Sequence, residues 1–261
     1  MSLTPSRTGD LNWVRVGEEG LPDLLLIHSL GTGLRMWDRQ IEAFSAVRRI
    51  LAFDLPGHGE SSAASGDYRL DDLGADVLGV ADAAGLDRFD VCGTSIGGLI
   101  GVWLAINHPD RVISLVAAGT AARLGSQELW SDRIEAVAAG GMEAIRAQVI
   151  RRFFAADFSE REPAVFAKIE RMFIDCDPVG YMGCCAALRD ADLRPEVMAI
   201  TCPTLVLCGS EDVAAPPAQG QWLQRHIDGS RLEMIDGAGH LPNLDQPEAF
   251  DRLVLAALTG G

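Results

Sequence analysis

A serine stands between two glycines in the stretch VCGTSIGG, residues 91–98, which contains the pattern G-x-S-x-G as Gly93, Ser95 and Gly97. When such a turn joins a strand to a helix, it strains the serine backbone and presents its hydroxyl as a nucleophile. The following helix directs its first N–H groups toward the point where negative charge develops. Glycine-rich turns of this kind also occur for packing alone, but the apolar runs on both sides favour Ser95 as a nucleophile.

A serine hydroxyl is a weak nucleophile without a general base, and histidine is the usual one. The chain has five histidines, which are His28, His58, His108, His226 and His240. His108 and His226 end predicted helices beside polar residues, where we expect them to be solvated. His58 lies in the turn DLPGHGES, where a structural role is expected. His240 follows the last predicted strand on a glycine-flanked loop, at the edge of a sheet where a base could meet Ser95.

The carboxylate that would orient this histidine is expected after the preceding strand, in LVLCGSEDVAAPP. This segment offers Glu211 and Asp212. The G-x-x-D spacing and the prolines that follow favour Asp212, with Glu211 as the alternative. No carboxylate occurs one strand earlier, in VAAGTAA. The predicted order of catalytic residues along the chain is therefore Ser95, Asp212, His240.

Hydrolysis of an ester also needs two backbone N–H donors for the oxyanion. One would be the N–H of Ile96, the residue after the nucleophile. The other is expected from the loop HSLGTG after the first long strand, where Leu30 is the best candidate. Ile96 and Leu30 thus complete the predicted reaction centre.

Apolar runs of strand length alternate with helix-length segments in the first half of the chain. The strand-like runs are 21–29, 48–57, 88–93 and 112–120. They are mostly continuous rather than alternating in polarity, which is typical of strands buried on both faces. Between them, 70–86 has apolar residues at helical spacing and ends near Gly85, and the helix that starts at 96 stops at Pro109. This rhythm predicts a parallel sheet with helices on both faces.

The rhythm breaks between residues 122 and 198, where the pattern is helical and no strand-like run occurs. Strand patterns return at 202–212 and 230–240. We therefore predict an α/β core of residues 1–121 and 199–261, with a mostly parallel sheet of about eight strands. The predicted core is interrupted by a helical cap, residues 122–198.

Composition limits the classes of partner. The net charge of −15 argues against nucleic acid and against an acidic membrane surface. Lys168 is the only lysine, so any pocket for an anionic substrate would be built from arginine. The N-terminal stretch has no signal-peptide pattern, and no apolar run reaches the roughly 18 residues of a membrane helix. The six cysteines, without any C-x-x-C pair, are expected to be reduced core thiols of a cytoplasmic protein.

With serine, acid and histidine in this order, the sequence resembles the α/β-hydrolase superfamily over essentially its whole length. His28 and Gly31 bracket the Leu30 loop as H-G-x-G does in that fold, although Ser29 replaces the usual glycine. A closer resemblance is to bacterial 3-oxoadipate enol-lactonases of the β-ketoadipate pathway. The segments that carry it are HSLGTGLRMWDRQ, DLPGHGES, CGTSIGGLIG, LGSQELWSDRI, FFAADFSEREP, AALRDADLRPE and PAQGQWLQRHIDGSRLEMID. The cap segments are the most specific, since the others are shared with esterases, haloperoxidases and C–C hydrolases of the same fold.

This resemblance implies hydrolysis of 3-oxoadipate enol-lactone to 3-oxoadipate, a step of aromatic catabolism, without a metal or an organic cofactor. The substrate carries a carboxylate. WSDRI, at the start of the predicted cap, resembles the W-x-x-R-I of the lactonases and places Trp130 and Arg133 on one helix face. Arg133 could pair with the carboxylate while Trp130 walls the pocket. The alternative interpretation is a surface arginine and a packed tryptophan.

Two other functions fit the same sequence. A carboxylesterase or lactonase for another small ester or lactone would use the same three catalytic residues. A non-catalytic ligand receptor could be built on the same fold, but the intact serine, acid and histidine argue against it. Peroxide-dependent oxidation is a side activity of the fold that nothing here favours.

Overall fold

The chain folds around one central sheet. In the computed structural model, which describes residues 2–6 and 8–258, this sheet has eight strands in the order β1-β2-β4-β3-β5-β6-β7-β8. The strands are β1 (Ser2–Ser6), β2 (Gly9–Val16), β3 (Asp23–Ile27), β4 (Arg49–Phe53), β5 (Phe89–Thr94), β6 (Val112–Ala118), β7 (Thr204–Gly209) and β8 (Arg231–Ile235). β2 pairs antiparallel with β1 and β4, and all other pairs are parallel. The predicted fold class, α/β with a mostly parallel sheet, is confirmed.

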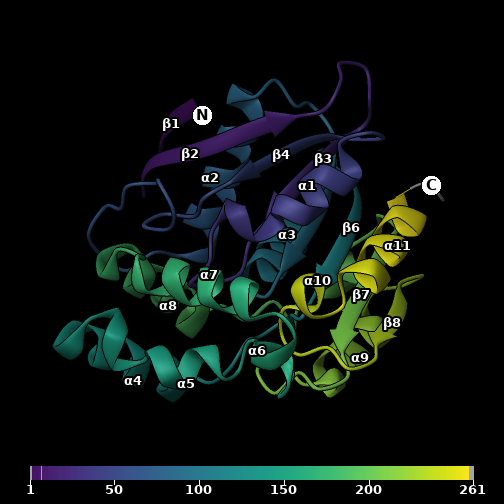
Figure 1. Cartoon of the computed structure of the whole chain (residues 1–261). Helices are drawn as coiled ribbons and strands as arrows, with labels where there is room; N and C mark the ends of the chain where they lie inside the picture. Colours follow the sequence, from purple (N-terminus) through teal and green to yellow (C-terminus); the bar gives the residue numbers. More distant parts are fainter. Residues whose placement is uncertain (1, 7, 259–261) are drawn as a thin grey trace.

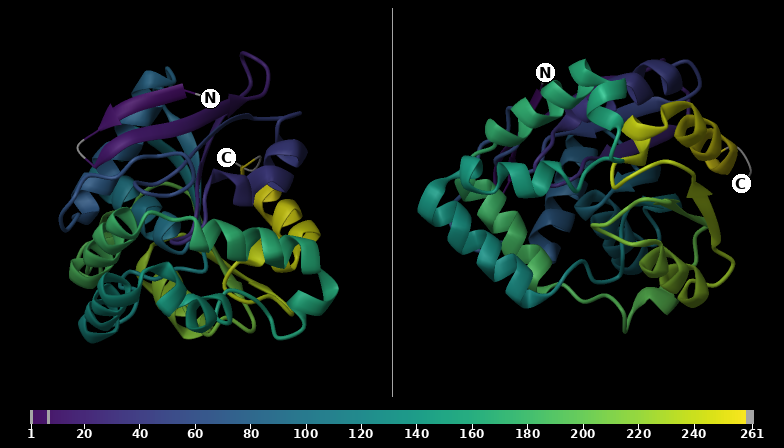
Figure 2. Two further views of the ribbon diagram at one scale, coloured as in Figure 1. Left: turned by 60° about the vertical axis from the view of Figure 1, so that its left-hand side comes forward. Right: turned by 60° about the horizontal axis from the view of Figure 1, so that its bottom comes forward.

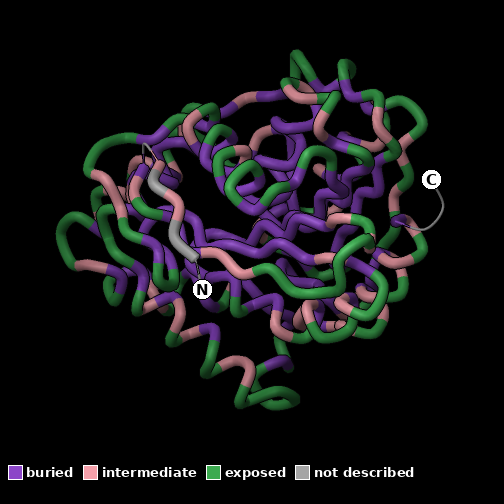
Figure 3. The backbone as a smooth tube through the Cα atoms, turned by 90° about the horizontal axis from the view of Figure 1, so that it is seen from above, coloured by how far each residue is buried: buried purple, intermediate pink, exposed green. Residues whose placement is uncertain are grey.

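The central strands are apolar because both of their faces are covered. Every residue of β5 and β7 is buried, whereas β8 at the edge has three exposed residues and one half-buried residue before its buried last residue. Figure 3 shows the buried strands running through the middle of the molecule, with exposed loops around them. Continuous burial explains why these segments lack the alternation of a half-exposed strand.

Helices cover both faces of the sheet (Figures 1 and 2). The helices of the core are α1 (Asp38–Phe44), α2 (Leu70–Ala83), α3 (Ile96–Asn107), α9 (Pro217–His226), α10 (Pro242–Asp245) and α11 (Pro247–Leu258), with the 3₁₀ turn η1 (Leu34–Trp37) before α1. α1 packs against α11, and α2 packs against α3. As predicted, α2 ends just before Gly85, which has a φ of 72°. Because these helices connect parallel strands, the carboxyl ends of those strands lie at the same edge of the sheet.

The segment between β6 and β7 is helical and has no strand. It contains α4 (Gln127–Gly140), α5 (Arg146–Ile150), α6 (Phe158–Arg161), α7 (Pro163–Ile174), α8 (Pro178–Asp190) and the 3₁₀ turns η2 (Met142–Ala144) and η3 (Val197–Ala199). α4 packs against α8, and these helices gather on one side of the sheet (Figure 1). We call residues 122–198 the cap.

The two ends of the cap meet. The Leu193 N–H donates to the carbonyl oxygen of Ala122 at 2.8 Å, and Arg123 lies 3.6 Å from the Asp192 carboxylate. β6, which precedes the cap, and β7, which follows it, pair with each other in the sheet. The cap therefore leaves and re-enters the core between two neighbouring strands.

Two further features bear on the sequence predictions. Five of the six cysteines are buried, and all six are free thiols. Within the described range, no helix combines the length and the apolar character needed to cross a bilayer.

Candidate active site

Ser95 occupies the turn between β5 and α3 in a strained backbone conformation. Its φ of 60° and ψ of −119° make it the one non-glycine residue with positive φ in the described part of the chain. The flanking glycines are required by close backbone approach. A Cβ on Gly93 would lie 2.2 Å from the Gly97 carbonyl oxygen, and a Cβ on Gly97 would lie 2.2 Å from the Ile27 carbonyl oxygen. The turn therefore has the geometry that the G-x-S-x-G pattern predicts.

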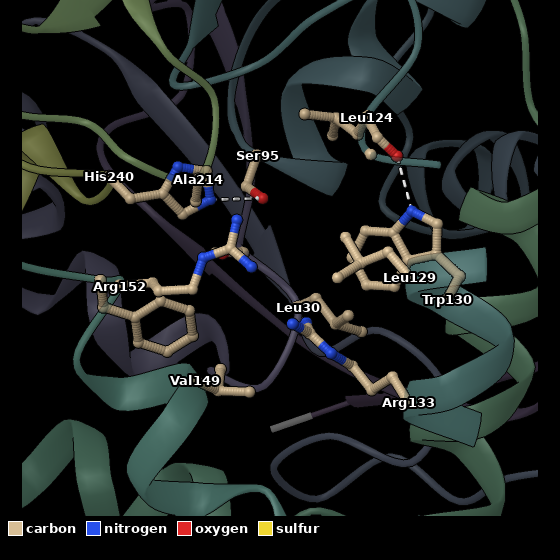
Figure 4. Close-up of a pocket in the computed structure, with 13 residues that line it drawn as sticks. Leu30, Ser95, Leu124, Leu129, Trp130, Arg133, Val149, Arg152, Ala214 and His240 are labelled. Atoms are coloured by element: carbon tan, nitrogen blue, oxygen red, sulfur yellow. Dashed lines mark hydrogen bonds between the residues drawn. The ribbon is translucent and has the colours of Figure 1, made fainter. Parts of the chain in front are cut away.

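The structure brings Ser95, His240 and Asp212 together from three separate loops. The Ser95 Oγ lies 2.8 Å from His240 Nε2, and His240 Nδ1 lies 2.9 Å from Asp212 Oδ2 (Figure 4). All three residues are buried. In neutral histidine, Nδ1–H donates to the carboxylate and Nε2 is left to accept the serine proton. The arrangement can remove a proton from the hydroxyl as it attacks.

The Asp212 carboxylate is fixed by its own loop. Its Oδ1 accepts hydrogen bonds from the Ala214 N–H at 2.7 Å and the Ala215 N–H at 2.8 Å, which leaves Oδ2 for His240. The alternative acid, Glu211, is exposed and makes no contact with His240 among the described residues. The geometry thus favours Asp212 over Glu211 as the partner of the histidine.

The two predicted oxyanion donors are the backbone N–H groups of Ile96 and Leu30. Ile96 is the first residue of α3, and Leu30 lines the same pocket as Ser95. Within the described range, no group accepts a hydrogen bond from either backbone N–H. Both donors are therefore available to a ligand oxygen.

The Leu30 loop is held by two buried histidines. His58 Nε2 accepts the Gly31 N–H at 3.0 Å, and His28 Nε2 accepts the Leu55 N–H at 2.8 Å. Each histidine makes a second hydrogen bond through Nδ1, with the Ser29 and Pro56 carbonyl oxygens as partners. Burial lowers the pKa of His28 to about 4 and that of His58 to about 3. Both rings are therefore neutral near pH 7, and His58 has the structural surroundings expected for it.

A pocket opens beside the serine, between the core and the cap. Its lining residues are Ser29, Leu30, Ser95, Leu124, Gly125, Leu129, Trp130, Arg133, Val149, Arg152, Phe153, Ala214 and His240. Most of them are apolar, and the cap supplies both charged ones. The pocket suits a small ligand with an apolar body and an anionic group.

Trp130 and Arg133 line this pocket from α4. The Arg133 guanidinium lies 4.8 Å from the centre of the Trp130 ring, and the Trp130 Nε1–H donates to the Leu124 carbonyl oxygen at 2.6 Å. Arg133 is only 9% exposed, so it is not a surface arginine. No carboxylate forms an ion pair with it in the described residues. A buried cation without an acidic partner is suited to an anionic ligand.

Arg152 is a second pocket cation that the sequence analysis did not single out. Its side chain enters the pocket from the segment after α5, and Figure 4 shows its guanidinium on the same side of the pocket as Ser95 and His240. Its Nη2 donates to the Val213 carbonyl oxygen at 3.4 Å. Burial lowers the pKa of Arg152, and the positive charge of Arg133 lowers it further. Nothing in RRFF, residues 151–154, distinguishes this arginine from its exposed neighbour Arg151.

The other two histidines lie away from the site. His226 is half-buried and stacks on Trp222 with 3.8 Å between ring centres, and His108 is half-buried with its ring 5.4 Å from Trp103. The expectation that both are solvated was therefore only partly right. Each has a tryptophan one helical turn or so before it in the sequence, a signal that was available.

The comparisons with known proteins agree with this geometry. A family model described as alpha/beta hydrolase fold matches residues 22–247. The chain is 38% identical to 3-oxoadipate enol-lactonase 2 of Acinetobacter baylyi, over 95% of this chain and 92% of that protein. It is 32% identical to a pimeloyl-[acyl-carrier protein] methyl ester esterase of Neisseria meningitidis, over 93% of this chain and 96% of that protein. The crystal structure of the enol-lactonase from Burkholderia xenovorans has a TM-score of 0.96 at 40% identity, covering 99% of this chain and 100% of that one.

Proposed function

The chain belongs to the α/β-hydrolase fold family and is a hydrolase, and we propose that its substrate is 3-oxoadipate enol-lactone, which it converts to 3-oxoadipate. Ser95, His240 and Asp212 would act through an acyl-enzyme. The observation that carries the proposal is the hydrogen-bonded chain from Ser95 to Asp212, next to a pocket that holds two arginines.

The first half-reaction opens the lactone. Ser95 Oγ attacks the lactone carbonyl carbon while its proton moves to His240 Nε2, and Asp212 stabilises the resulting imidazolium. The N–H groups of Leu30 and Ile96 would hold the oxyanion. The bond from the carbonyl carbon to the ring oxygen then breaks, and that oxygen takes the proton from His240. The leaving group is an enol tethered to the acyl chain, and its conversion to a ketone makes the step hard to reverse.

The second half-reaction frees the product. Water gives a proton to His240 Nε2 and attacks the acyl carbon, and the ester bond to Ser95 breaks as the serine oxygen takes that proton back. All proton transfers use side chains of the protein. No metal or organic cofactor enters the proposed mechanism.

Substrate recognition is proposed to come from the cap. Arg133 would pair with the carboxylate that the lactone already carries, and Trp130 would pack on the ring. Arg152 adds a second positive charge to the same pocket. Burial and mutual repulsion make two neighbouring arginines costly when no carboxylate among the described residues forms an ion pair with them, and a bound anion would offset this cost.

The proposal extends to the biological setting. Hydrolysis of this lactone belongs to the β-ketoadipate pathway of aromatic catabolism, and the substrate would be a small anionic molecule. Free, buried thiols are compatible with the proposed cytoplasmic location. The alternative is a carboxylesterase or lactonase for another small substrate. The 32% identity to a methyl ester esterase supports this alternative.

The test compares two substrates under the same conditions. Enzymatically generated enol-lactone and the neutral ester p-nitrophenyl acetate are hydrolysed by the wild type and by Ser95→Ala. We expect a kcat/KM about 10- to 150-fold higher for the lactone, consistent with a charge-assisted contact that only the lactone makes. In the Ser95→Ala variant, both hydrolysis rates should fall until only about 10³- to 10⁴-fold acceleration over the uncatalysed rate remains.

Two outcomes would contradict the proposal in different ways. Equal or faster hydrolysis of p-nitrophenyl acetate by the wild type would favour the general esterase. Turnover by the Ser95→Ala variant at the wild-type rate would exclude Ser95 as the nucleophile.

A further inference from the structure

Asp245 is a buried carboxylate that lies next to the candidate site without lining the pocket wall at Ser95. It ends α10, and its side chain is 0% exposed. One of its oxygens, Oδ2, accepts the Gly239 N–H at 2.7 Å. Gly239 immediately precedes His240 in the loop of residues 237–241, which we call the base loop. Asp245 therefore fixes the backbone of the residue next to the proposed general base.

The same carboxylate also holds the cap. The Ala155 N–H points at it, 3.2 Å from Oδ2 and 3.4 Å from Oδ1. Ala155 belongs to the segment of residues 152–155, which we call the arginine segment because it begins with Arg152. One side chain thus joins the base loop to the piece of the cap that carries the second pocket cation.

Other contacts align the same two segments. The Leu241 N–H donates to the Phe153 carbonyl oxygen at 2.9 Å. The Phe153 ring stacks on the His240 ring with 6.3 Å between centres and 22° between planes. A Cβ on Gly239 would lie 2.5 Å from the Phe154 carbonyl carbon, so the two backbones touch. The base loop and the arginine segment are therefore packed as one unit.

The charge of Asp245 is only partly balanced. Arg161 Nη2 lies 3.6 Å from Oδ1, and the same arginine pairs with Asp157 at 2.9 Å. Burial raises the pKa of Asp245 to about 6, although the two backbone donors and Arg161 oppose this effect. The group is ionised near pH 7 and accepts hydrogen bonds from donors that have no other partner among the described residues.

We propose that Asp245 is a positioning residue that sets His240 and Arg152 relative to each other, and so couples the proton transfer to the binding of an anionic substrate. The proposal rests on the proposed role of Ser95 and His240. A buried carboxylate costs stability that an apolar side chain of similar size would not. Its presence here is explained if a fixed geometry between base and cation is what it provides.

The coupling makes a specific kinetic prediction. If Asp245 only stabilised the fold, its loss would lower the melting temperature and affect all substrates alike. If it positions both groups, the loss of His240 alignment should lower kcat for every ester. The loss of Arg152 alignment should raise KM for an anionic ester alone. The two effects can be separated with two model esters, p-nitrophenyl acetate and the monoanionic mono-p-nitrophenyl glutarate.

The experiment uses the full chain with Asp245→Asn, Asp245→Glu, Arg152→Met and the double variant Asp245→Asn/Arg152→Met. Asp245→Asn should lower kcat on both esters about 10-fold, less than the 100-fold typical of a displacement of 1 Å. It should also raise KM for the glutarate ester by a further factor of about 10, the weakening expected when a charge-assisted contact is lost. In the Arg152→Met background, Asp245→Asn should not raise KM again, because the two residues act as one unit.

A matched control is Asp76→Asn. Asp76 is another buried carboxylate, 3% exposed, whose pKa burial raises to about 6, and it accepts a hydrogen bond from Thr8; neither residue lines the pocket. This variant should change the melting temperature and leave kcat and KM for both esters unchanged. Asp245→Glu keeps the negative charge, so its kcat on both esters and its KM for the glutarate ester should lie closer to the wild-type values than those of Asp245→Asn. If Asp245→Asn folds poorly, Asp245→Glu provides the test.

The proposal is overturned if Asp245→Asn folds and hydrolyses both esters like the wild type, or if KM for the two esters changes equally. It is also overturned if the KM effects of Asp245→Asn and Arg152→Met are additive. Failure of the proposed function is distinguishable, because absent enol-lactone turnover leaves the model-ester comparison intact. The role of Ser95 is tested by its own variant.

Discussion

His240 connects the two hydrogen bonds on which the proposed chemistry depends. Its Nδ1 faces Asp212 at 2.9 Å and its Nε2 faces Ser95 at 2.8 Å, so the tautomer is set by the acid. The carboxylate is itself oriented by two backbone donors. The proposed chemistry therefore depends on which nitrogen of His240 carries the proton. Replacing one carboxylate oxygen of Asp212 with an amide nitrogen is enough to test this dependence.

Asp212→Asn should lower kcat by about 10⁴-fold, because the amide favours the histidine tautomer that cannot accept the serine proton. Hydrolysis of p-nitrophenyl acetate measures the effect. Glu211→Gln is the matched control, since Glu211 is the exposed neighbour, and it should behave like the wild type. The reverse pattern would mean that Glu211 is the acid.

Arg133→Met should lower kcat/KM for the anionic lactone about 10- to 150-fold and leave p-nitrophenyl acetate almost unchanged. The magnitude follows from the 1.5–3 kcal/mol of a charge-assisted pair, and methionine keeps about the same apolar bulk beside Trp130. The control is Arg171→Met, which removes an exposed arginine from α7 of the cap. Equal losses on both substrates would indicate a packing role for Arg133.

Individual residues differed in how well the sequence identified them. Ser95, Asp212 and His240 could be placed because each follows a strand and carries a local signature of glycines or prolines. Arg152 could not, since its entry into the pocket depends on how the arginine segment packs on the base loop. That packing joins residues about 90 positions apart, which no local pattern encodes.

Among the elements, the β5–turn–α3 unit leaves little space for larger side chains at its glycines. The turn is possible because Gly93 and Gly97 leave space for backbone atoms, and the strain at Ser95 is held by the strands on both sides. The Ser95 N–H donates to the Ala118 carbonyl oxygen of β6 at 2.9 Å, which fixes the turn to the sheet. The element positions the proposed nucleophile, Ser95, because close backbone contacts prevent the turn from relaxing.

Gly97→Ala should lower the free energy of unfolding by about 1–3 kcal/mol and reduce activity, because its Cβ would overlap the Ile27 carbonyl oxygen. Urea denaturation and p-nitrophenyl acetate hydrolysis measure the two effects. Gly79→Ala is the control, an exposed position in α2 with no atom within 4 Å of the new Cβ. It should raise stability by about 0.5–1 kcal/mol and keep full activity, and equal behaviour of the two variants would refute the steric argument.

The elements themselves were predictable where burial made the pattern simple. Strands β3 to β7 are apolar runs, and their predicted ranges contain the observed ones except at β5, which extends one residue further, to Thr94. The sequence analysis placed no strand at β1 or β2. The pair forms an antiparallel hairpin at the edge of the sheet, and β2 mixes buried and exposed residues without strict alternation. Its pairing with β4 is a tertiary contact that stabilises what local propensity does not.

For the molecule as a whole, the balance of charge and burial sets its response to pH. His28 and His58 are fully buried and their pKa values are lowered, so unfolding at mildly acidic pH allows both to take up protons. Their contribution to stability is fully present above the unfolded pKa of about 6.5 and is lost as the pH falls below it. Burial raises the pKa values of Asp76 and Asp245 to about 6, which has the opposite effect in the same range.

Between pH 7 and pH 5, each of these histidines should lower the free energy of unfolding by about 2 kcal/mol. Between these two pH values, the free energy of unfolding of His58→Gln should therefore fall by about 2 kcal/mol less than that of the wild type. The contribution of the carboxylates is the same in the two proteins. Urea denaturation at the two pH values measures the decrease in each protein. Identical pH dependence of the His58→Gln variant and the wild type would contradict the assignment.

The meeting of the two ends of the cap has a consequence for protein engineering and for evolution by recombination. An insertion whose ends are joined by the Leu193–Ala122 hydrogen bond can be exchanged as a cassette, because the host needs to close only one short gap. The exchange has one condition at the far side of the cassette. The donor must present a carbonyl oxygen at the position of Phe153 and an N–H at the position of Ala155, where the host offers Leu241 and Asp245. Chimaeras that preserve this docking point should inherit a working base together with the donor's substrate preference.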